Sequence, residues 1–375
     1  MSSLPRRRLA LVIAAAGVVV LLGAGALVLR WPEKPVVVAG RAGTVHRTMA
    51  TWIPYWGTRN AYATVLRNAD LFEYASPFWY RASGLTTIQA HRGAGDAALV
   101  AGLHRKGVLV VPTVTLGLTA ARWSAAMISQ ANRAAHVAAL VRLAVAHRYD
   151  GIDLDYESFA RVASAAQART VRDTFSAVAA GLCARLHALG KRCTITVMAR
   201  TADVPTTWRG RYAVWIYDYR SLLGTADRLR VMAYDQHSSG GAPGPIAATG
   251  WVAAITRYAA SKADAVGVPR SRVEIALPSY GYDWAGSNGV SRTSAGMEEL
   301  RRSVGATRRW DKIAEEWTFV YTKSHVRHVV YYPDATSTRR KLAVVRAAHE
   351  RYGLWLPLGA DPAVWSDAFR PASTW

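Results

Sequence analysis

The chain of 375 residues is long enough for a large barrel domain, and its 51% apolar content supplies a core and excludes wholesale disorder. Lysine and arginine number 47 against 25 acidic residues, a formal charge of +22, but the cations are scattered, so we expect no nucleic-acid partner. Two cysteines exclude a disulfide-stapled scaffold and a four-cysteine metal site.

Residues 9–29 form an uncharged apolar run that follows three arginines at residues 6–8. A helix of this length spans about 31 Å at ~1.5 Å per residue, which is enough to cross a bilayer. The arginines would stay in the cytoplasm and place the rest of the chain outside the cell. Small residues at 24–26 resemble a cleavage site, so secretion after cleavage is the alternative. We expect residues 1–34 to be a cytoplasmic stub and single-pass membrane anchor, and residues 35–49 to be a tether.

From residue 51 onward, short apolar runs typical of strands alternate with Ala- and Arg-rich stretches typical of helices. The predicted strands span residues 51–56, 71–79, 107–115, 151–156, 192–198, 228–234, 273–280 and 353–358. The predicted helices include residues 95–106, 121–147, 163–189 and 249–267. Eight strands with helices between them predict an α/β fold, a (β/α)8 TIM barrel over residues 50–366. The long seventh connection, residues 282–337, is predicted to form an inserted α+β lobe, and residues 367–375 a C-terminal tail.

The predicted fourth strand carries four acids, because residues 150–157 read Asp-Gly-Ile-Asp-Leu-Asp-Tyr-Glu. Side chains alternate along a strand, so Asp153, Asp155 and Glu157 share the face that points into the lumen, whereas Asp150 takes a structural role. Stacked carboxylates repel one another, which raises their pKa values and keeps one protonated near neutral pH as a general acid. The run lacks the central glycine and distant glutamate of an EF-hand, so we expect no bound metal.

This run resembles the DGxDxDxE signature of glycoside hydrolase family 18, the chitinase-like (β/α)8 enzymes. Residues 231–235 (VMAYD) resemble the M-x-Y-D motif of that family. Residues 52–56 (WIPYW) and 277–284 (LPSYGYDW) resemble the bacterial branch that includes spore-germination and cortex-lytic N-acetylglucosaminidases. The resemblance covers about residues 50–366.

The resemblance implies a glycosidase that hydrolyses β-1,4 bonds next to N-acetylglucosamine, in peptidoglycan or a chitin-like glycan, by substrate-assisted retention and without a cofactor. Glu157 would protonate the leaving oxygen while the acetamide oxygen of the substrate attacks the anomeric carbon. Asp155 would orient the acetamide and stabilise the oxazolinium-like intermediate, and Asp153 would share a proton or hydrogen bond with it. Tyr234 would donate its hydroxyl to the acetamide, and Asp235 would hold sugar hydroxyls.

Aromatic side chains at strand ends suit a carbohydrate site, because the C–H faces of sugars stack on flat rings. The candidates are Tyr55, Trp56, Trp79, Tyr280, Trp284 and Trp355. The family usually ends strand eight with W-x-L-G, but here Leu356 holds the register of the tryptophan and Trp355 comes one residue early. A slip of one residue turns a side chain to the opposite face. Either a bulge returns Trp355 to the floor of the sugar site, or the floor is weakened.

Some alternatives stay open at this point. Cys183 and Cys193 could pair outside the cell, although two separate buried thiols are the favoured interpretation. The alternative function is a catalytically silent, lectin-like barrel, but lectins of the family commonly lose the acid that Glu157 represents, so its presence favours the enzyme. We expect a monomer that binds an N-acetylglucosamine-containing polysaccharide and is attached to the membrane by its N-terminal helix.

Overall fold

The computed structural model describes residues 47–370, apart from residues 163, 204–205, 209–210 and 214. The predicted anchor, nearly all of the predicted tether and most of the predicted C-terminal tail lie outside these residues. Within the described part of the chain, no helix is both long and apolar enough to cross a bilayer. The membrane anchor at residues 1–34 therefore stays a prediction.

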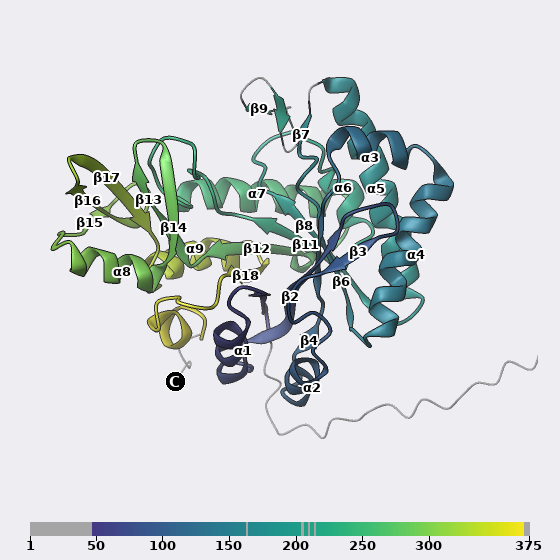
Figure 1. Ribbon diagram of the computed structural model, residues 1–375, viewed down its shortest axis with the longest axis horizontal. Coiled ribbons are helices and arrows are strands. Elements are labelled where there is room, and N and C mark those ends of the chain that lie inside the picture. Colours follow the sequence, from purple (N-terminus) through teal and green to yellow (C-terminus); the bar gives the residue numbers. More distant parts are fainter. Residues whose placement is uncertain (1–46, 163, 204–205, 209–210, 214, 371–375) are drawn as a thin grey trace, which may run out of the picture. The chain divides into compact units, whose positions relative to one another are not determined.

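Eight parallel strands close into a barrel, because the first strand pairs with both the second and the last (Figure 1). Around the barrel they follow the order β1-β18-β12-β11-β8-β6-β5-β2. Their bounds are β1 Met49–Pro54, β2 Phe72–Ala82, β5 Thr113–Leu116, β6 Gly151–Asp155, β8 Arg192–Met198, β11 Arg228–Met232, β12 Val273–Pro278 and β18 Arg351–Trp355. The closed parallel sheet confirms the predicted (β/α)8 barrel.

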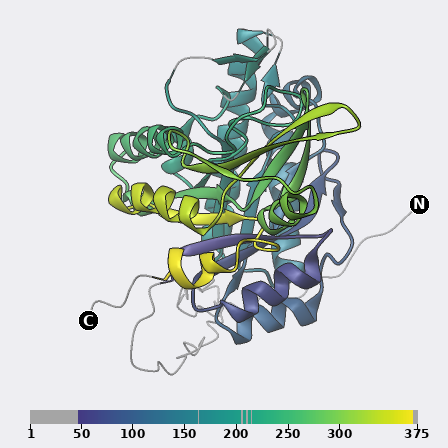
Figure 2. The same ribbon diagram turned by 90° about the vertical axis from the view of Figure 1, so that its left-hand side faces the viewer.

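Helices cover the outside of the barrel. They are α1 Thr58–Arg67, α2 Ala97–Arg105, α3 Ala120–Met127, α4 Gln130–Ala146, α5 Ala165–His187, α6 Tyr219–Leu223, α7 Thr249–Ala265 and α9 Ala335–Ala347. Figures 1 and 2 show α7 and α9 lying side by side, where both contact β12. The remaining short elements outside the lobe are β3 Ile88–Ala90, β4 Leu109–Val110, β7 Arg161–Val162, β9 Thr206–Trp208, β10 Arg211–Ala213, a 3-10 turn Arg270–Arg272 and a π-helical turn Val364–Ala368.

The helix predicted over residues 121–147 is two helices, α3 and α4, and the break has a local cause. Ser129 caps α4 by accepting a hydrogen bond from the backbone N–H of Asn132. The side chains of Asn132 and Arg133 donate to the carbonyl oxygens of Ala126 and Met127 at the end of α3. Polar side chains thus satisfy both helix ends, which a pattern of apolar spacing does not reveal.

A lobe with its own sheet lies between β12 and α9 and begins at Tyr280, two residues before the predicted insertion at residues 282–337. Its elements are β13 Tyr280–Ala285, β14 Asn288–Thr293, α8 Ser294–Ser303, β15 Arg309–Asp311, β16 Glu316–Lys323 and β17 Val326–Tyr332. The strands are antiparallel in the order β14-β13-β17-β16-β15 and extend beside the barrel in Figure 1. The core of the lobe consists of Met297, Phe319, Val330 and Tyr332. The first lobe strand follows β12 directly, so the lobe reaches the carboxyl end of the barrel.

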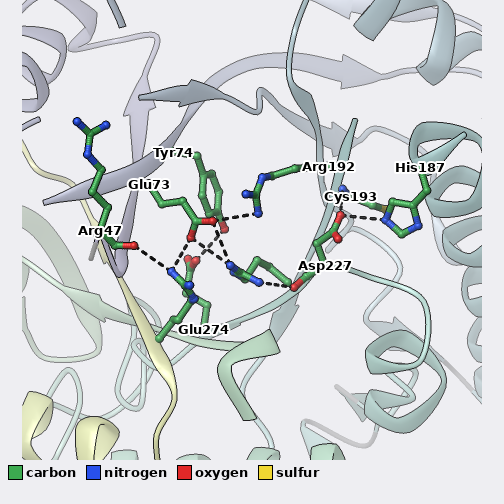
Figure 3. Close-up of polar contacts among 10 residues, drawn as sticks. Arg47, Glu73, Tyr74, His187, Arg192, Cys193, Asp227 and Glu274 are labelled. Atoms are coloured by element: carbon green, nitrogen blue, oxygen red, sulfur yellow. Dashed lines mark hydrogen bonds and ion pairs between the residues drawn. The ribbon is translucent and has the colours of Figure 1, made fainter. Parts of the chain in front are cut away.

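Charged residues fill the amino end of the lumen. Glu73, near the start of β2, accepts ion pairs from Arg192 (3.0 Å), Arg228 (3.1 Å) and Arg351 (2.6 Å), which begin β8, β11 and β18. Figure 3 shows Glu73 and Arg192 of this group beside Glu274, with the guanidinium group of Arg192 directed at the Glu73 carboxylate. Residues at the starts of parallel strands meet at the same end of a barrel, which explains how four distant segments share one charge cluster.

A disulfide joins Cys183 of α5 to Cys193 of β8. The favoured prediction of two separate buried thiols is therefore wrong. Both residues are fully buried, as that prediction required, but the turn between α5 and β8 brings the helix end back against the strand start. The pairing depends on this turn, and a spacing of ten residues does not determine it.

Candidate active site

The fourth barrel strand, β6, directs its acids into the lumen. Asp153 is fully buried and accepts hydrogen bonds from the hydroxyl groups of Thr113 (2.8 Å) on β5 and Thr196 (2.7 Å) on β8. Asp155 is buried two residues further along the strand, and Glu157 follows in an exposed position beyond the strand end. The three carboxyl groups therefore run from inside the lumen to its open carboxyl end, as the alternation predicted.

Residues of the other parity face away from the lumen. The hydroxyl of Tyr156 lies 2.8 Å from Nε2 of His136 on α4, between the sheet and the helices. Asp150 accepts a hydrogen bond from the backbone N–H of Val110 and lies 2.7 Å from Nε2 of His104 on α2. Asp150 thus joins two strands and a helix, which agrees with the structural role predicted for it.

A cavity of about 410 Å³ opens above these acids at the carboxyl end of the barrel. The cavity is lined by Trp56, Phe78, Asp155, Glu157, Met232, Tyr234, Asp235, Tyr280, Tyr282, Ser291, Trp355 and Leu356. Both predicted acids of the strand end and three of the six predicted aromatic residues are among them. None of these described lining residues is basic, so the open side of the carboxyl groups faces aromatic rather than cationic side chains.

This environment favours protonated groups. Burial raises the pKa of Asp155 well above its usual range, and the charges of Glu157 and Asp153 raise it further. Burial also raises the pKa of the Tyr234 hydroxyl, with the charges of Asp155 and Glu157 adding to the effect. At neutral pH the Tyr234 hydroxyl is therefore a hydrogen-bond donor. The acid of the cluster with a strongly raised pKa is thus Asp155.

Trp355 forms an aromatic floor in the cavity. Its ring stacks on Tyr234, with 6.3 Å between ring centroids and 19° between planes, and meets Trp56 and Phe78 edge-on at 6.1 and 5.7 Å. The next residue, Leu356, has a left-handed φ of 66°, which is uncommon for a non-glycine residue. Of the two alternatives, the structure has Trp355 in the cavity. No bulge interrupts the strand, because the pairing of β18 with β12 stays regular up to Trp355. The left-handed turn lies at Leu356, after the strand has ended.

Asp235 is held at the rim of the cavity by an unusual backbone conformation. Its φ is 59°, in the left-handed region that aspartate tolerates better than most residues. Its carboxylate accepts a hydrogen bond from the hydroxyl of Tyr280, the first residue of the lobe. Tyr282, two residues later, lines the cavity from the same strand. The lobe therefore supplies one wall of the site.

Three of the predicted sugar-binding aromatic residues lie outside this cavity, and for two of them the prediction is wrong. Trp79 is fully buried in the core between the barrel and its helices. Trp284 is fully buried and donates its indole N–H to the carbonyl oxygen of Ser238 at 3.3 Å. Neither can stack on a sugar. Tyr55 stacks on His91, with 4.2 Å between ring centroids, and lines a neighbouring groove.

The sequence analysis missed four wall residues besides Leu356. Phe78, rather than Trp79, lies in the wall because it has the same parity as Tyr74 and Ser76, whose hydroxyl groups contact Glu274 and Arg230 inside the barrel. Met232 and Tyr282 have the same parity as the predicted Tyr234 and Tyr280, so alternation was a signal that could have found both. Ser291 reaches the cavity through its pairing with Tyr282 in the lobe, for which the sequence gives no local signal.

A family model for glycosyl hydrolases family 18 matches residues 115–356, a span that includes the acids of β6 and the cavity floor. The chain belongs to this family. The resemblance read from the DGxDxDxE run is thus confirmed, and with it the prediction of a glycoside hydrolase at the level of the family. The matched span holds Asp153, Asp155 and Glu157 as well as the M-x-Y-D segment.

Individual relatives agree with this assignment. The chain is 28% identical over 207 residues to YvbX of Bacillus subtilis (strain 168), which carries the name of a glycosylase; the match covers 54% of this chain and 55% of YvbX, so the chain spans about half of that relative. It is 28% identical over 331 residues to YdhD of the same organism, which carries the name of a sporulation-specific glycosylase; the match covers 82% of this chain and 74% of YdhD. This relation supports the predicted spore-germination branch.

A solved structure is also similar. The crystal structure of a chitinase from Chromobacterium violaceum ATCC 12472 has a TM-score of 0.73 and 26% sequence identity, and the match covers 84% of this chain and 96% of that chain. The family 18 fold therefore extends over nearly all of the described residues, including strands that precede the span of the family model.

Proposed function

We propose that this chain hydrolyses β-1,4 bonds next to N-acetylglucosamine in a glycan, by substrate-assisted retaining catalysis with Glu157 as the general acid. The observation that carries the proposal is the position of Glu157 above the buried Asp155, in a cavity with an aromatic floor. Glu157 is exposed to the cavity and is therefore the carboxyl group that a glycosidic oxygen can reach.

The state of Asp155 supports the acetamide of the substrate as the nucleophile. A conventional retaining glycosidase needs a second carboxylate that attacks the anomeric carbon. Burial and the neighbouring acids keep Asp155 protonated, and a protonated carboxyl group is a poor nucleophile. Asp155 and the Tyr234 hydroxyl instead lie where they can bind the acetamide and hold it against the anomeric carbon, while Trp355 supports the sugar ring.

A groove next to the cavity supports an anionic glycan such as peptidoglycan rather than neutral chitin. This groove of about 760 Å³ shares Trp56 with the catalytic cavity and is lined by Arg59, Arg92 and Arg105. Within the described part of the chain, none of the three guanidinium groups forms an ion pair or a hydrogen bond. The acidic residue of the groove, Asp96, caps α2 through its Oδ1. Carboxylates of lactyl groups and peptide stems would find three cations here.

The disulfide supports a location outside the cytoplasm. Disulfides form and persist in oxidising compartments, and Cys183 is bonded to Cys193. Together with the apolar run at residues 9–29, this bond supports the proposal of a monomeric, membrane-attached enzyme that acts on the cell wall from outside. Fractionation of cells with protease treatment of the intact surface tests this location: protection of the barrel from the protease would contradict it.

Incubation of the chain with chitooligosaccharides and with purified peptidoglycan tests the reaction. We expect new reducing ends on N-acetylglucosamine, which mass spectrometry of the products detects. Oligosaccharides that lack the acetamide at the reacting sugar should be nearly inert, because they lack the nucleophile. Binding of the glycans without any products would instead favour the lectin-like alternative, and a trapped glycosyl ester on Asp153 or Asp155 would overturn the substrate-assisted mechanism.

Glu157→Gln provides the sharpest control. The variant keeps the shape and polarity of the side chain but cannot transfer a proton. We expect turnover to fall by about 10²–10⁴-fold, the range typical of losing a general acid, while glycan binding persists. Near-normal turnover in this variant would remove Glu157 from the proposed role.

Replacing the three arginines of the neighbouring groove should have a smaller effect, on the KM for anionic substrates alone. Replacing Arg59, Arg92 and Arg105 together by glutamine should raise the KM for peptidoglycan fragments by about 5–10-fold, because each exposed charge pair contributes less than about 1 kcal/mol. The KM for neutral chitooligosaccharides should stay unchanged and serves as the control. An equal increase for both substrates would mean that the groove does not select for charge.

A further inference from the structure

Arg230 lies on β11 below the catalytic cavity and is fully buried inside the barrel. Its Nε donates to Oε1 of Glu274 on β12 at 2.5 Å. Its Nη1 lies 3.2 Å from Oδ2 of Asp153 and 3.2 Å from the hydroxyl of Ser76 on β2. One guanidinium group therefore joins three strands and contacts the deepest acid of the DxDxE run.

We propose that Arg230, held by Glu274, is a positioning residue that keeps Asp153 as a carboxylate and thereby confines the proton of the aspartate pair to Asp155. The inference rests on the proposed glycosidase function, because it concerns the protonation state of the same acids. It differs from the expectation that Asp153 and Asp155 share one proton.

The contacts of Asp153 support a fixed negative charge. Its Oδ1 accepts a hydrogen bond from the Thr196 hydroxyl, and its Oδ2 accepts from the Thr113 hydroxyl and from Arg230. A guanidinium group can only donate hydrogen bonds, so its partner oxygen must accept. Both oxygens of Asp153 are thus acceptors, which is the arrangement that stabilises a carboxylate.

Asp155 has a different set of neighbours. Its Oδ1 is buried, and among the described residues it has no hydrogen-bond partner. Burial raises the pKa of both aspartates. The charge of Arg230 and the two threonine hydroxyls lower the pKa of Asp153 against a smaller raising effect of Glu274, whereas the charges of Glu157 and Asp153 raise the pKa of Asp155 against a smaller lowering effect of Arg230. When the two acids hold one proton between them, that proton is therefore more stable on Asp155 than on Asp153.

Stability alone does not explain why Arg230 and Glu274 form an ion pair inside the barrel. Barrel interiors are usually filled by branched apolar side chains, and burying an ion pair gains little over such packing. Here Tyr74 donates its hydroxyl to Oε2 of Glu274 at 2.7 Å, and the indole of Trp52 lies 4.1 Å from the guanidinium carbon of Arg230. These contacts fix the direction of the guanidinium group towards Asp153.

All ionisable groups around the two aspartates enter the expected pH dependence. They come from several elements and are Tyr74, Glu157, Tyr217, Arg230, Tyr234 and Glu274. Burial raises the pKa values of the tyrosines, and Arg230 stays charged, so neither the tyrosines nor Arg230 accounts for an acid limb. Protonation of Asp153 should therefore set the acid limb of the pH profile of kcat.

The double variant Arg230→Gln/Glu274→Gln tests the proposal without changing the net charge of the lumen. Loss of the cation should raise the pKa of Asp153 and move the acid limb of kcat to higher pH, by about one to three pH units. Arg230→Lys keeps the charge and should restore most of the original limb. The matched control is Glu73→Gln, which removes a carboxylate from the arginine cluster at the amino end and should leave the limb unchanged.

A milder variant covers the case in which the double variant fails to fold. Thr196→Val removes one donor from Asp153 with little change in shape, and it should move the acid limb in the same direction by a smaller amount. An unchanged limb in Thr196→Val and in the folded double variant would overturn the proposal. A uniform loss of kcat at every pH would also overturn it, because that result indicates packing alone.

Carbon-13 NMR of the aspartate carboxyl groups separates failure of this inference from failure of the proposed function, because it requires no turnover. At pH 6 we expect the signal of Asp155, identified by its loss in Asp155→Asn, to be that of a neutral acid and the signal of Asp153 that of a carboxylate. A neutral Asp153 would overturn the inference even in an active enzyme. An inactive enzyme with the expected signals would overturn only the glycosidase.

Discussion

The two ends of the barrel lumen differ in the side chains that surround their acids. At the amino end, Glu73 contacts three arginines, and Glu274 is paired with Arg230. At the carboxyl end, the cavity around Asp155 and Glu157 contains no basic residue among its described lining. The same closed sheet positions both groups, so the difference lies in what the strands place around them.

The comparison shows where this protein keeps charges for stability and where it keeps them for chemistry. A buried carboxylate that is neutralised by cations stays ionised and holds strands together, but it has no proton to transfer. A buried carboxyl group without a cation keeps its proton near neutral pH, which is costly for folding and useful for acid catalysis. Asp153 lies between the two regions: it forms an ion pair with Arg230, and its charge acts on Asp155 two residues further along the strand.

The largest expected effect comes from replacing an acid of the carboxyl end. Asp155→Asn should lower kcat by about 10²–10³-fold, because the amide cannot balance the positive charge of the intermediate. The variant should keep its fold. The amide has nearly the same shape as the carboxyl group and carries no charge, and the raised pKa of Asp155 shows that its buried site disfavours a charge. Steady-state kinetics and circular dichroism check the two parts, and near-normal turnover would contradict the role of Asp155.

The same chemical change at the amino end should act on stability instead. Glu73→Gln removes the negative charge that three arginines share. It should lower the free energy of unfolding by about 2 kcal/mol. This loss is smaller than for a fully buried ion pair, because Glu73 is partly exposed to solvent. Urea denaturation measures this loss. The kcat should match that of the unaltered enzyme, and a fall comparable to that of Asp155→Asn would end the distinction between the two regions.

Glu350 sharpens the comparison because it lacks a partner but lies outside the cavity. It immediately precedes β18, it is buried, and neither carboxylate oxygen has a hydrogen-bond partner among the described residues. Its pKa is raised from 4.5 to about 9, chiefly by burial, against the lowering charge of Arg270 and with a smaller raising effect of Asp264. The folded chain therefore keeps a proton that the unfolded chain releases above about pH 4.5, so stability falls as the pH rises from there towards 9.

Glu350→Gln should remove this pH-dependent loss. We expect Tm to rise by a few degrees at pH 8 and to change little at pH 4, with kcat unaffected. Thermal denaturation followed by circular dichroism at the two pH values measures the difference. An equal change in Tm at both pH values would mean that Glu350 is not protonated in the fold.

Much of the site could be predicted from the sequence because the relevant signals are local. Alternation along β6 places Asp153, Asp155 and Glu157 on one face whatever the rest of the fold does, and the DGxDxDxE run carries the family resemblance. The eight strands and most helices also follow from local periodicity. Alternation also accounts for Phe78 rather than Trp79 in the cavity, because Phe78 has the same parity as the lumen-facing Tyr74 and Ser76.

Only the tertiary structure decided which distant residues surround each acid. Arg230 and Glu274 look like ordinary polar residues of two strands, and they meet Asp153 only because β11, β12 and β6 close into one barrel at a particular register. The disulfide and the left-handed turn that leaves Trp355 in the cavity likewise depend on where chain segments return after a turn. A sequence determines the face on which a side chain lies, since that depends on its immediate neighbours. The charge state of that side chain depends on groups that strand pairing brings from far along the chain.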